Sequence, residues 1–99
     1  MTGKIEYAFT GSIWQHLPAG GWHFVSLPSE LSTEIRNNLK SEEEGWGRLK
    51  ARAAVGASNW DTAIWFDTKR GTYLLPIKAD IRKKQLLTAG DQVQVVIWI

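Results

Sequence analysis

The residues best suited to chemistry are scattered along this chain and form no catalytic motif. Its two histidines, His16 and His23, stand seven positions apart, and the chain has no cysteine. Two imidazoles without a thiolate or a nearby carboxylate triplet make a poor zinc site. There is no Gly-x-Ser-x-Gly elbow, and Gly20-Gly21 leads into a predicted strand, whereas a phosphate-binding loop leads into a helix. We therefore expect neither a bound metal nor a cofactor.

Carboxylates are the remaining candidates for acid–base catalysis. Asp61, Asp67 and Asp80 fall at or near the ends of predicted strands, where a solvated acid is the ordinary occurrence. The acidic run at residues 41–45 has three glutamates and no other ligand donors, so we interpret it as a solvated connector. A small-molecule enzyme is consequently an alternative, and we expect a protein without catalytic activity.

Basic and aromatic residues give the stronger functional signal. Three cations share one face of a predicted strand, and four more follow Pro76 in a short turn: Arg48, Lys50, Arg52, then Lys78, Arg82, Lys83 and Lys84. Six tryptophans are many for 99 residues. Exposed rings would be stacking platforms for a planar ligand or single-stranded nucleic acid, and the candidates are Trp22, Trp46, Trp60 and Tyr73. The competing interpretation is a solvated basic face over core tryptophans.

These residues predict a ligand-binding site at a barrel mouth near residues 76–82. Its predicted members are Trp60, Thr62, Arg48, Tyr73, Lys78 and Arg82. We expect a non-enzymatic binding or accessory module with a small-molecule or protein partner, because Trp and Arg are favoured interface anchors. The first alternative is a nucleic-acid-binding or transcription-regulator-like barrel that uses the basic strand and turn residues.

Length and charge narrow the class of protein. A chain of 99 residues is predicted to be one domain, residues 1–99, with room for one modest core. The net charge of +2 does not by itself imply nucleic acid or an acidic membrane. The first twenty residues lack a signal-peptide core and no run spans a membrane, so we expect a cytoplasmic protein, monomeric or homodimeric, without a membrane partner.

Hydrophobic periodicity predicts mostly strands. Alternation of apolar and polar residues indicates strands at residues 4–14, 22–27, 46–56, 59–67, 72–77 and 92–99. Leu31, Ile35 and Leu39 recur every fourth residue and predict one amphipathic helix at residues 29–39. Residues 78–87 are predicted to form about one helical turn. Many short strands with Gly and Pro turns favour a mainly β fold, a small barrel of six or seven strands.

The chain also contains a weak internal echo. Leu27-Pro28 is followed by Ile35-Arg36, and Leu75-Pro76 is followed by Ile81-Arg82. Each copy then leads through glycine into another strand, which predicts a barrel of two pseudo-twofold halves. The second copy resembles the Leu-Pro, Ile-Arg and Gly-Asp-x-Val signature of swapped-hairpin, AbrB-like DNA-binding and antitoxin domains.

Taken over nearly its full length, the chain resembles a bacterial domain-of-unknown-function family found alone or N-terminal to YdeI/OmpD-associated bacteriocin-protection segments. The resemblance implies a small β-barrel with one helix and supplies no catalytic residues. At the position after Thr62 the family tends to have Ser or Thr, followed by Leu, an aromatic residue and Pro. This chain reads Thr62-Ala-Ile-Trp-Phe66 and so lacks the second hydroxyl and the proline. The matching residues are Gly21-Trp22, Phe24-Val25, Leu27-Pro28, Gly45-Trp46-Gly47-Arg48-Leu49-Lys50, Trp60-x-Thr62, Gly71-x-Tyr73-x-Leu75-Pro76-x-Lys78-Ala79-x-Ile81-Arg82-Lys83 and Gly90-Asp91-x-Val93.

Overall fold

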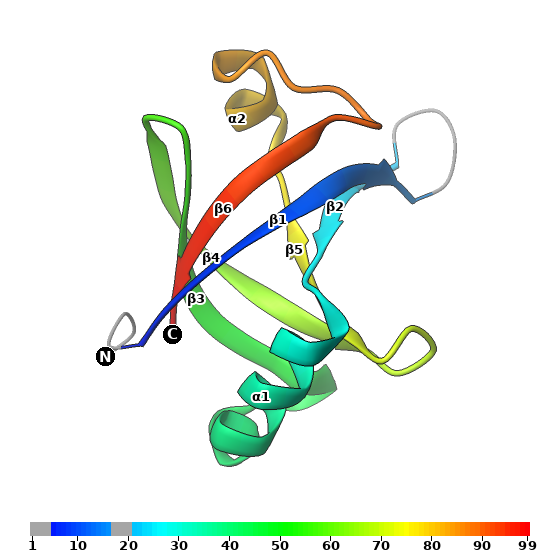
Figure 1. The fold of residues 1–99 in the computed structure, drawn as a ribbon, viewed down its shortest axis with the longest axis vertical. Helices are drawn as coiled ribbons and strands as arrows, with labels where there is room; N and C mark the ends of the chain where they lie inside the picture. Colours follow the sequence, from blue (N-terminus) through cyan, green and yellow to red (C-terminus); the bar gives the residue numbers. More distant parts are fainter. Residues whose placement is uncertain (1–4, 17–20) are drawn as a thin grey trace.

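Six antiparallel strands close into a barrel in the computed structural model of this chain (Figure 1). The structure describes residues 5–16 and 21–99, apart from the side chain of Trp46. The strands are β1 (Glu6–Gln15), β2 (His23–Ser26), β3 (Arg48–Val55), β4 (Ser58–Asp67), β5 (Thr72–Pro76) and β6 (Gln92–Trp98). The helices are α1 (Ser29–Leu39) and α2 (Ala79–Lys84), and 3₁₀ turns occur at Lys40–Glu42 and Gly45–Gly47. The prediction of a mainly β barrel with one amphipathic helix and a short helical turn is confirmed.

The order of the strands explains the internal echo. Around the barrel they follow β1-β2-β5-β4-β3-β6, and each strand pairs antiparallel with both neighbours. Exchanging the first three strands with the last three leaves every pairing in place. The halves β1-β2-α1-β3 and β4-β5-α2-β6 therefore share one topology, as the repeated Leu-Pro and Ile-Arg predicted. A relationship to AbrB-like proteins stays a prediction.

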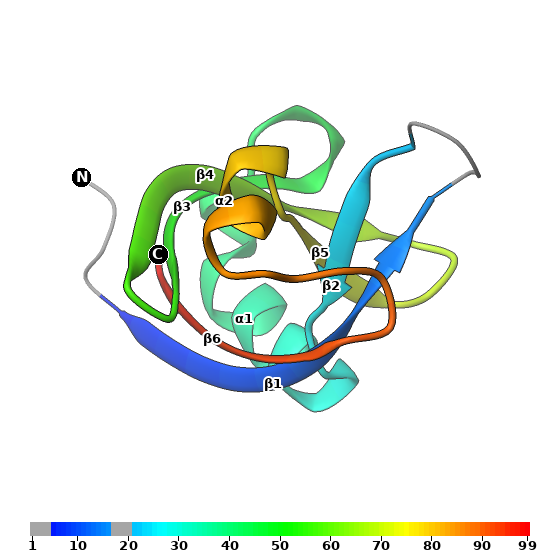
Figure 2. The same cartoon turned by 90° about the horizontal axis from the view of Figure 1, so that it is seen from above.

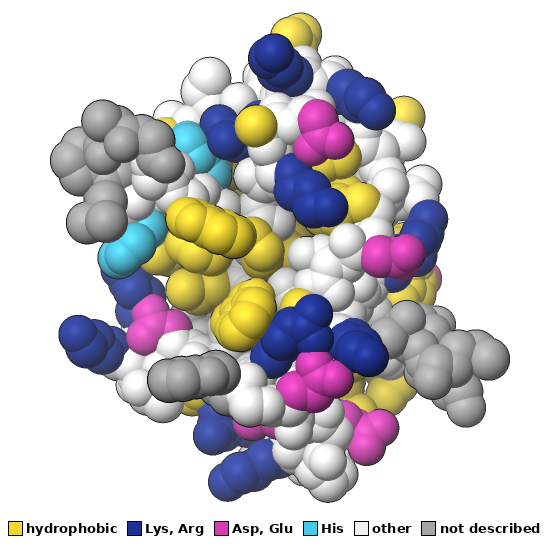
Figure 3. All heavy atoms as spheres, turned by 180° about the vertical axis from the view of Figure 1, so that it is seen from behind, with side chains coloured by type: hydrophobic (Ala, Val, Ile, Leu, Met, Phe, Trp, Pro, Cys, Tyr) yellow, Lys and Arg dark blue, Asp and Glu magenta, His cyan; other side chains and the backbone are white. Residues whose placement is uncertain are grey.

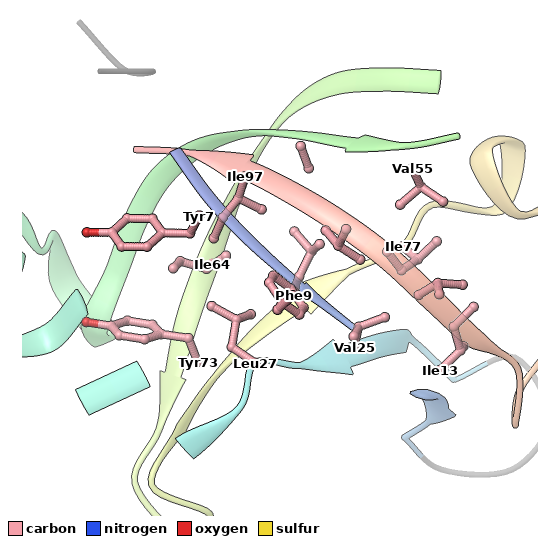
Figure 4. Close-up of a cluster of buried hydrophobic side chains, with 14 of the residues drawn as sticks. Tyr7, Phe9, Ile13, Val25, Leu27, Val55, Ile64, Tyr73, Ile77 and Ile97 are labelled. Carbon is pink, nitrogen blue, oxygen red and sulfur yellow. The ribbon is translucent and has the colours of Figure 1, made fainter. Parts of the chain in front are cut away.

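Alternation along the strands separates the core from the outer surface. On β3, Leu49 and Ala53 are buried, whereas Lys50 and Arg52 are exposed. The same period places Tyr7 and Phe9 of β1 in the core. Figure 4 shows Tyr7 and Tyr73 side by side, with both hydroxyls directed away from Val55 and Ile77. The hydroxyl ends of these tyrosines thus mark one end of the core.

Helix α1 packs at one end of the barrel and α2 at the other (Figures 1 and 2). In α1, Ile35 is fully buried, while Leu31 and Leu39 are partly buried against the core, so the predicted helix face is confirmed. Ser32 is also fully buried, and its hydroxyl oxygen accepts a 3.0 Å hydrogen bond from the backbone N–H of Tyr73. This bond ties α1 to β5.

Helix α2 is held over the opposite end by contacts to the β3–β4 turn. Ile81 is buried, and the Gln85 side chain donates a 2.9 Å hydrogen bond from Nε2 to Ser58 Oγ. Gly56 in that turn has a φ of +57°, and a Cβ there would lie 2.2 Å from Gln85 Oε1. Only glycine combines this backbone angle with the close approach of Gln85. The longest helix, α1, has 11 residues, and nowhere in residues 5–16 and 21–99 is a helix long and apolar enough to cross a bilayer.

Candidate functional site

The six residues predicted to form one site are divided between the two ends and the interior of the barrel. Lys78 immediately precedes α2, and Arg82 lies within it. Arg48 is the first residue of β3, whereas the α2 end of that strand is Val55 next to Gly56. A strand of that length spans roughly 23 Å, so Arg48 lies far from Lys78 and Arg82. The structure does not bring the six together.

Two of the predicted rings belong to the core. Trp60 and Tyr73 face the barrel interior and are almost completely buried, so neither offers an exposed face for stacking. Their alternation with outward residues on β4 and β5 sends both rings inward, where they pack with Ile64 and its neighbours. Thr62 is half-buried on β4. The predicted platform at Trp46 lies outside the described side chains.

Lys78 and Arg82 belong to a surface that we call the α2 cap, residues 78–88. A shallow, open cleft of about 480 Å³ lies along this segment. Its walls combine apolar and cationic side chains, and they are Ala79, Arg82, Lys83, Leu86, Leu87 and Thr88. Of the six residues predicted for the site, only Arg82 lines this cleft, and the apolar lining residues are Ala79, Leu86 and Leu87.

The cations of the α2 cap are not neutralised by neighbouring acids. In the part of the chain that the structure describes, no ion pair involves Lys78, Arg82, Lys83 or Lys84. Asp80 accepts a hydrogen bond from the backbone N–H of Ile81 instead. On the barrel wall the situation differs. There Arg48 and Lys50 both pair with Glu44, and Arg52 pairs with Asp61 at 2.8 Å.

Arg82 is the anchored member of this group. Its Nε donates a hydrogen bond to the carbonyl oxygen of Ile77 at 3.3 Å, and its Nη1 lies 3.4 Å from Nε2 of His23. These contacts join α2 to the first residue of β2 and hold the half-buried Arg82 in the lining of the cleft. Lys83 remains exposed on the cleft wall.

Leu86 ends the helix in an unusual way. The N–H of Leu86 bonds the carbonyl of Lys83, and the N–H of Leu87 bonds that of Arg82, which is the Schellman pattern. Leu86 therefore occupies the position normally held by glycine, with a φ of +55°. This left-handed conformation costs an L-residue roughly 1–2 kcal/mol. The residue is also 87% exposed, so folding gains little from a leucine at this position.

A second exposed surface runs along β1 and β2. Trp22 is 68% exposed, and its ring stacks on that of Phe24 with centroids 6.2 Å apart. The ring of Phe24 in turn packs on Trp14, with centroids 5.2 Å apart. Arg70 lies over Trp14, with its Cζ 4.5 Å from the ring, and pairs with Asp67. Figure 3 shows hydrophobic side chains gathered on one face and bordered by histidine and basic side chains.

The acidic run at residues 41–45 is not simply a solvated connector, and that interpretation was wrong for Glu43. Its side chain is only 10% exposed, accepts a hydrogen bond from the Tyr73 hydroxyl, and lies 3.8 Å from Arg36 Nη1. Burial raises the pKa of Tyr73, and the hydrogen bond and charge of Glu43 raise it further. Burial also raises the pKa of Tyr7, against a lowering contribution from its hydrogen bond to Asn38.

These shifts predict how stability depends on alkaline pH. An unfolded tyrosine has a pKa of about 10, and both tyrosines have higher values in the folded chain. Above pH about 10 the unfolded chain loses protons that the folded chain keeps, so the free energy of unfolding falls as pH rises. Below that pH the two phenols add no pH dependence. Denaturant unfolding across this range, with Tyr73→Phe for comparison, measures the effect. Ultraviolet detection of two phenolates near pH 10 in the folded chain would contradict it.

The three aspartates considered for acid–base chemistry have structural partners or lie in solvent. Asp61 is exposed and paired with Arg52. The hydrogen bond from Arg70 lowers the pKa of Asp67, which also accepts backbone N–H groups in the β4–β5 turn. Asp80 is exposed. Across residues 5–16 and 21–99, no three His, Cys, Asp or Glu side chains form a group able to hold a metal ion.

Comparison with known proteins gives a family but no activity. No curated protein matches the chain. One family model, described as a domain of unknown function, matches residues 9–97, which covers all six strands except the first residues of β1 and the last of β6. The chain therefore belongs to the domain-of-unknown-function family DUF1905.

Proposed function

We propose that this chain is a non-catalytic binding module whose α2 cap receives an acidic protein segment that carries an apolar side chain. One observation carries the proposal: Arg82 and Lys83, two cations without ion-pair partners among the described residues, line a cleft whose walls include Leu86 and Leu87. Lys78 and Lys84, which also have no ion pair there, adjoin these lining residues in the chain. Carboxylates of a partner would supply the missing counter-charges. An apolar side chain would cover the leucines and remove their surface from water.

Leu86 supports this occupant. A leucine at a helix-ending position that favours glycine costs conformational energy, and an exposed leucine recovers almost none by burial. Contact between Leu86 and an apolar side chain of a partner would offset this conformational cost by burying the leucine. Strain of this kind is frequently retained where a residue takes part in binding.

Single-stranded nucleic acid is a second candidate, favoured by the exposed Trp22 ring. Trp22 precedes His23, which contacts Arg82, so an exposed stacking face adjoins the basic cap. Against it, Trp22 and Phe24 already stack on each other, and Arg70 is paired with Asp67. A phosphate chain would also leave Leu86 without an apolar contact.

A peptide-binding experiment tests the proposal. The probe is a synthetic peptide rich in glutamate with one central leucine, and its control replaces the glutamates with glutamines. We expect the acidic peptide to bind, Lys83→Glu to weaken binding by roughly tenfold, and Leu86→Gly to weaken it while leaving the unfolding free energy unchanged or raised. Fluorescence anisotropy with a labelled peptide measures each affinity, and denaturant unfolding measures stability.

Lys69→Glu is the matched control. Lys69 is exposed in the β4–β5 turn, and its reversal changes the net charge by the same amount as Lys83→Glu. Equal losses of peptide affinity in the two variants would show that total charge alone decides binding and would contradict the proposal. Tighter binding of oligothymidine than of peptide, lost in Trp22→Ala, would favour the nucleic-acid candidate instead.

A further inference from the structure

A second cleft lies at the α1 end of the barrel, and it is independent of the α2 cap. Its volume is about 250 Å³. Its lining residues come from α1, the loop before β3, the end of β4 and the β4–β5 turn, and they are Arg36, Glu43, Gly47, Phe66 and Thr68. Arg36 and Arg82 are the two arginines of the internal echo, so each half of the barrel places an arginine in a cleft at its own end.

The Arg36 guanidinium is fixed in position by an aromatic ring. Its Cζ lies 3.8 Å from the centroid of Phe66. Phe66 is itself held by the edge of Tyr73 at 5.1 Å and by the backbone of Gly47. A Cβ on Gly47 would come within 3.0 Å of the Phe66 Cβ, and its φ of +69° also favours glycine. The guanidinium plane is thus prearranged beside the cleft.

The hydrogen-bonding capacity of Arg36 is unused within the described residues. Its Nη1 is buried and has no hydrogen-bond acceptor among them, since Glu43 Oε2 lies 3.8 Å away, which is too far. None of the other guanidinium N–H groups bonds a described residue either. Glu43 meanwhile accepts from Tyr73. The cleft therefore pairs a charged, planar donor with an apolar ring and the exposed Thr68.

The chemistry of this arrangement selects one class of ligand. A carboxylate matches a guanidinium edge with two parallel hydrogen bonds. Glu43 lies beside the same guanidinium, and its charge disfavours a doubly charged anion such as phosphate. A volume of 250 Å³ equals that of roughly eight waters, which limits the ligand to a small molecule. We propose that the Arg36 cleft binds a small organic monocarboxylate, with the carboxylate on Arg36 and the apolar part against Phe66.

Benzoate is the probe, and benzamide, which has nearly the same shape without the charge, is its control. Titration of the full chain followed by amide NMR is expected to give saturable benzoate shifts at Gly47 and Thr68. Benzamide is expected to give none. Arg36→Gln should weaken benzoate binding by roughly tenfold or more, and Arg36→Lys, which keeps the charge but loses the fork, should weaken it less.

Arg52→Gln is the matched protein control, because Arg52 is an exposed arginine paired with Asp61. Its benzoate affinity is expected to equal that of the wild type. Three results would overturn the inference: no saturable shift in the wild type, unchanged benzoate affinity in a folded Arg36 variant, or equal binding of benzamide. Shifts confined to the α2 cap would overturn it as well, and they would bear on the proposed function instead.

Discussion

Replacing Ile35 with alanine is expected to lower the free energy of unfolding by about 2–5 kcal/mol. Ile35 is fully buried and belongs to the main core cluster, so the substitution removes apolar contacts and leaves a cavity between α1 and the barrel. Because the inward residues of β3 and β5 are held by closed strand pairing, we expect little collapse around that cavity.

Leu31→Ala is the comparison for Ile35→Ala. Leu31 lies on the same helix face but is only partly buried, so its loss is expected to be smaller. Urea unfolding of both variants gives the two free energies. Equal, negligible losses would contradict the packing of α1 on the barrel end.

Replacing Glu43 with alanine is expected to cost about 1–3 kcal/mol. The change removes the acceptor of the Tyr73 hydroxyl and the carboxylate nearest Arg36, and it leaves a buried donor and a half-buried cation without that partner. The neighbouring glutamate provides a closely matched control. Glu44 is exposed, and its ion pairs with Arg48 and Lys50 lie at the surface, so Glu44→Ala is expected to cost less than about 1 kcal/mol.

Denaturant unfolding of the two glutamate variants checks this contrast. The Glu43 variant is also expected to lower the pKa of Tyr73 toward its ordinary value, because part of the shift comes from Glu43. A loss of stability as small as that of Glu44→Ala would show that Glu43 is in solvent, as the sequence alone suggested.

Local periodicity was enough to predict most elements of this fold. The four-residue spacing of Leu31, Ile35 and Leu39 predicted α1 with its observed bounds. This was possible because residues four apart in the sequence lie on the same face of a helix. Alternation predicted the strands, with differences of a few residues at their ends. Repeated Leu-Pro and Ile-Arg predicted the matching halves.

Those sequence patterns did not predict which residues far apart in the chain contact each other. Ser32 and Tyr73 are 41 positions apart, and Glu43 and Tyr73 are 30 apart, so no local spacing marks either hydrogen bond. Glutamate in an acidic run is ordinarily solvated, and only the fold places Glu43 beside Arg36. The predicted site failed in a similar way, because Trp60 and Tyr73 both point inward. On β4 both faces carry a tryptophan, Trp60 on one and Trp65 on the other, so the sequence did not show which one is exposed.

Leu86 is a residue whose type suggests burial but which the fold leaves exposed. An apolar residue after a short helix suggests core, yet its left-handed conformation directs the side chain into solvent. The feature that the sequence does offer is the absence of glycine where the helix ends. Together with the basic residues of α2, this position distinguishes the α2 end from the α1 end, where an 11-residue helix continues into a 3₁₀ turn.

The salt dependence of acidic-peptide binding tests the role of the α2 cap most directly. If Lys78, Arg82, Lys83 and Lys84 supply the counter-charges, affinity should fall steadily as salt rises, since ions screen exposed charges. The fall should be shallower in Lys83→Glu and unchanged in Lys69→Glu. Peptide affinity that is independent of salt, or a salt response altered equally by both reversals, would contradict the assignment of the α2 cap as the binding site.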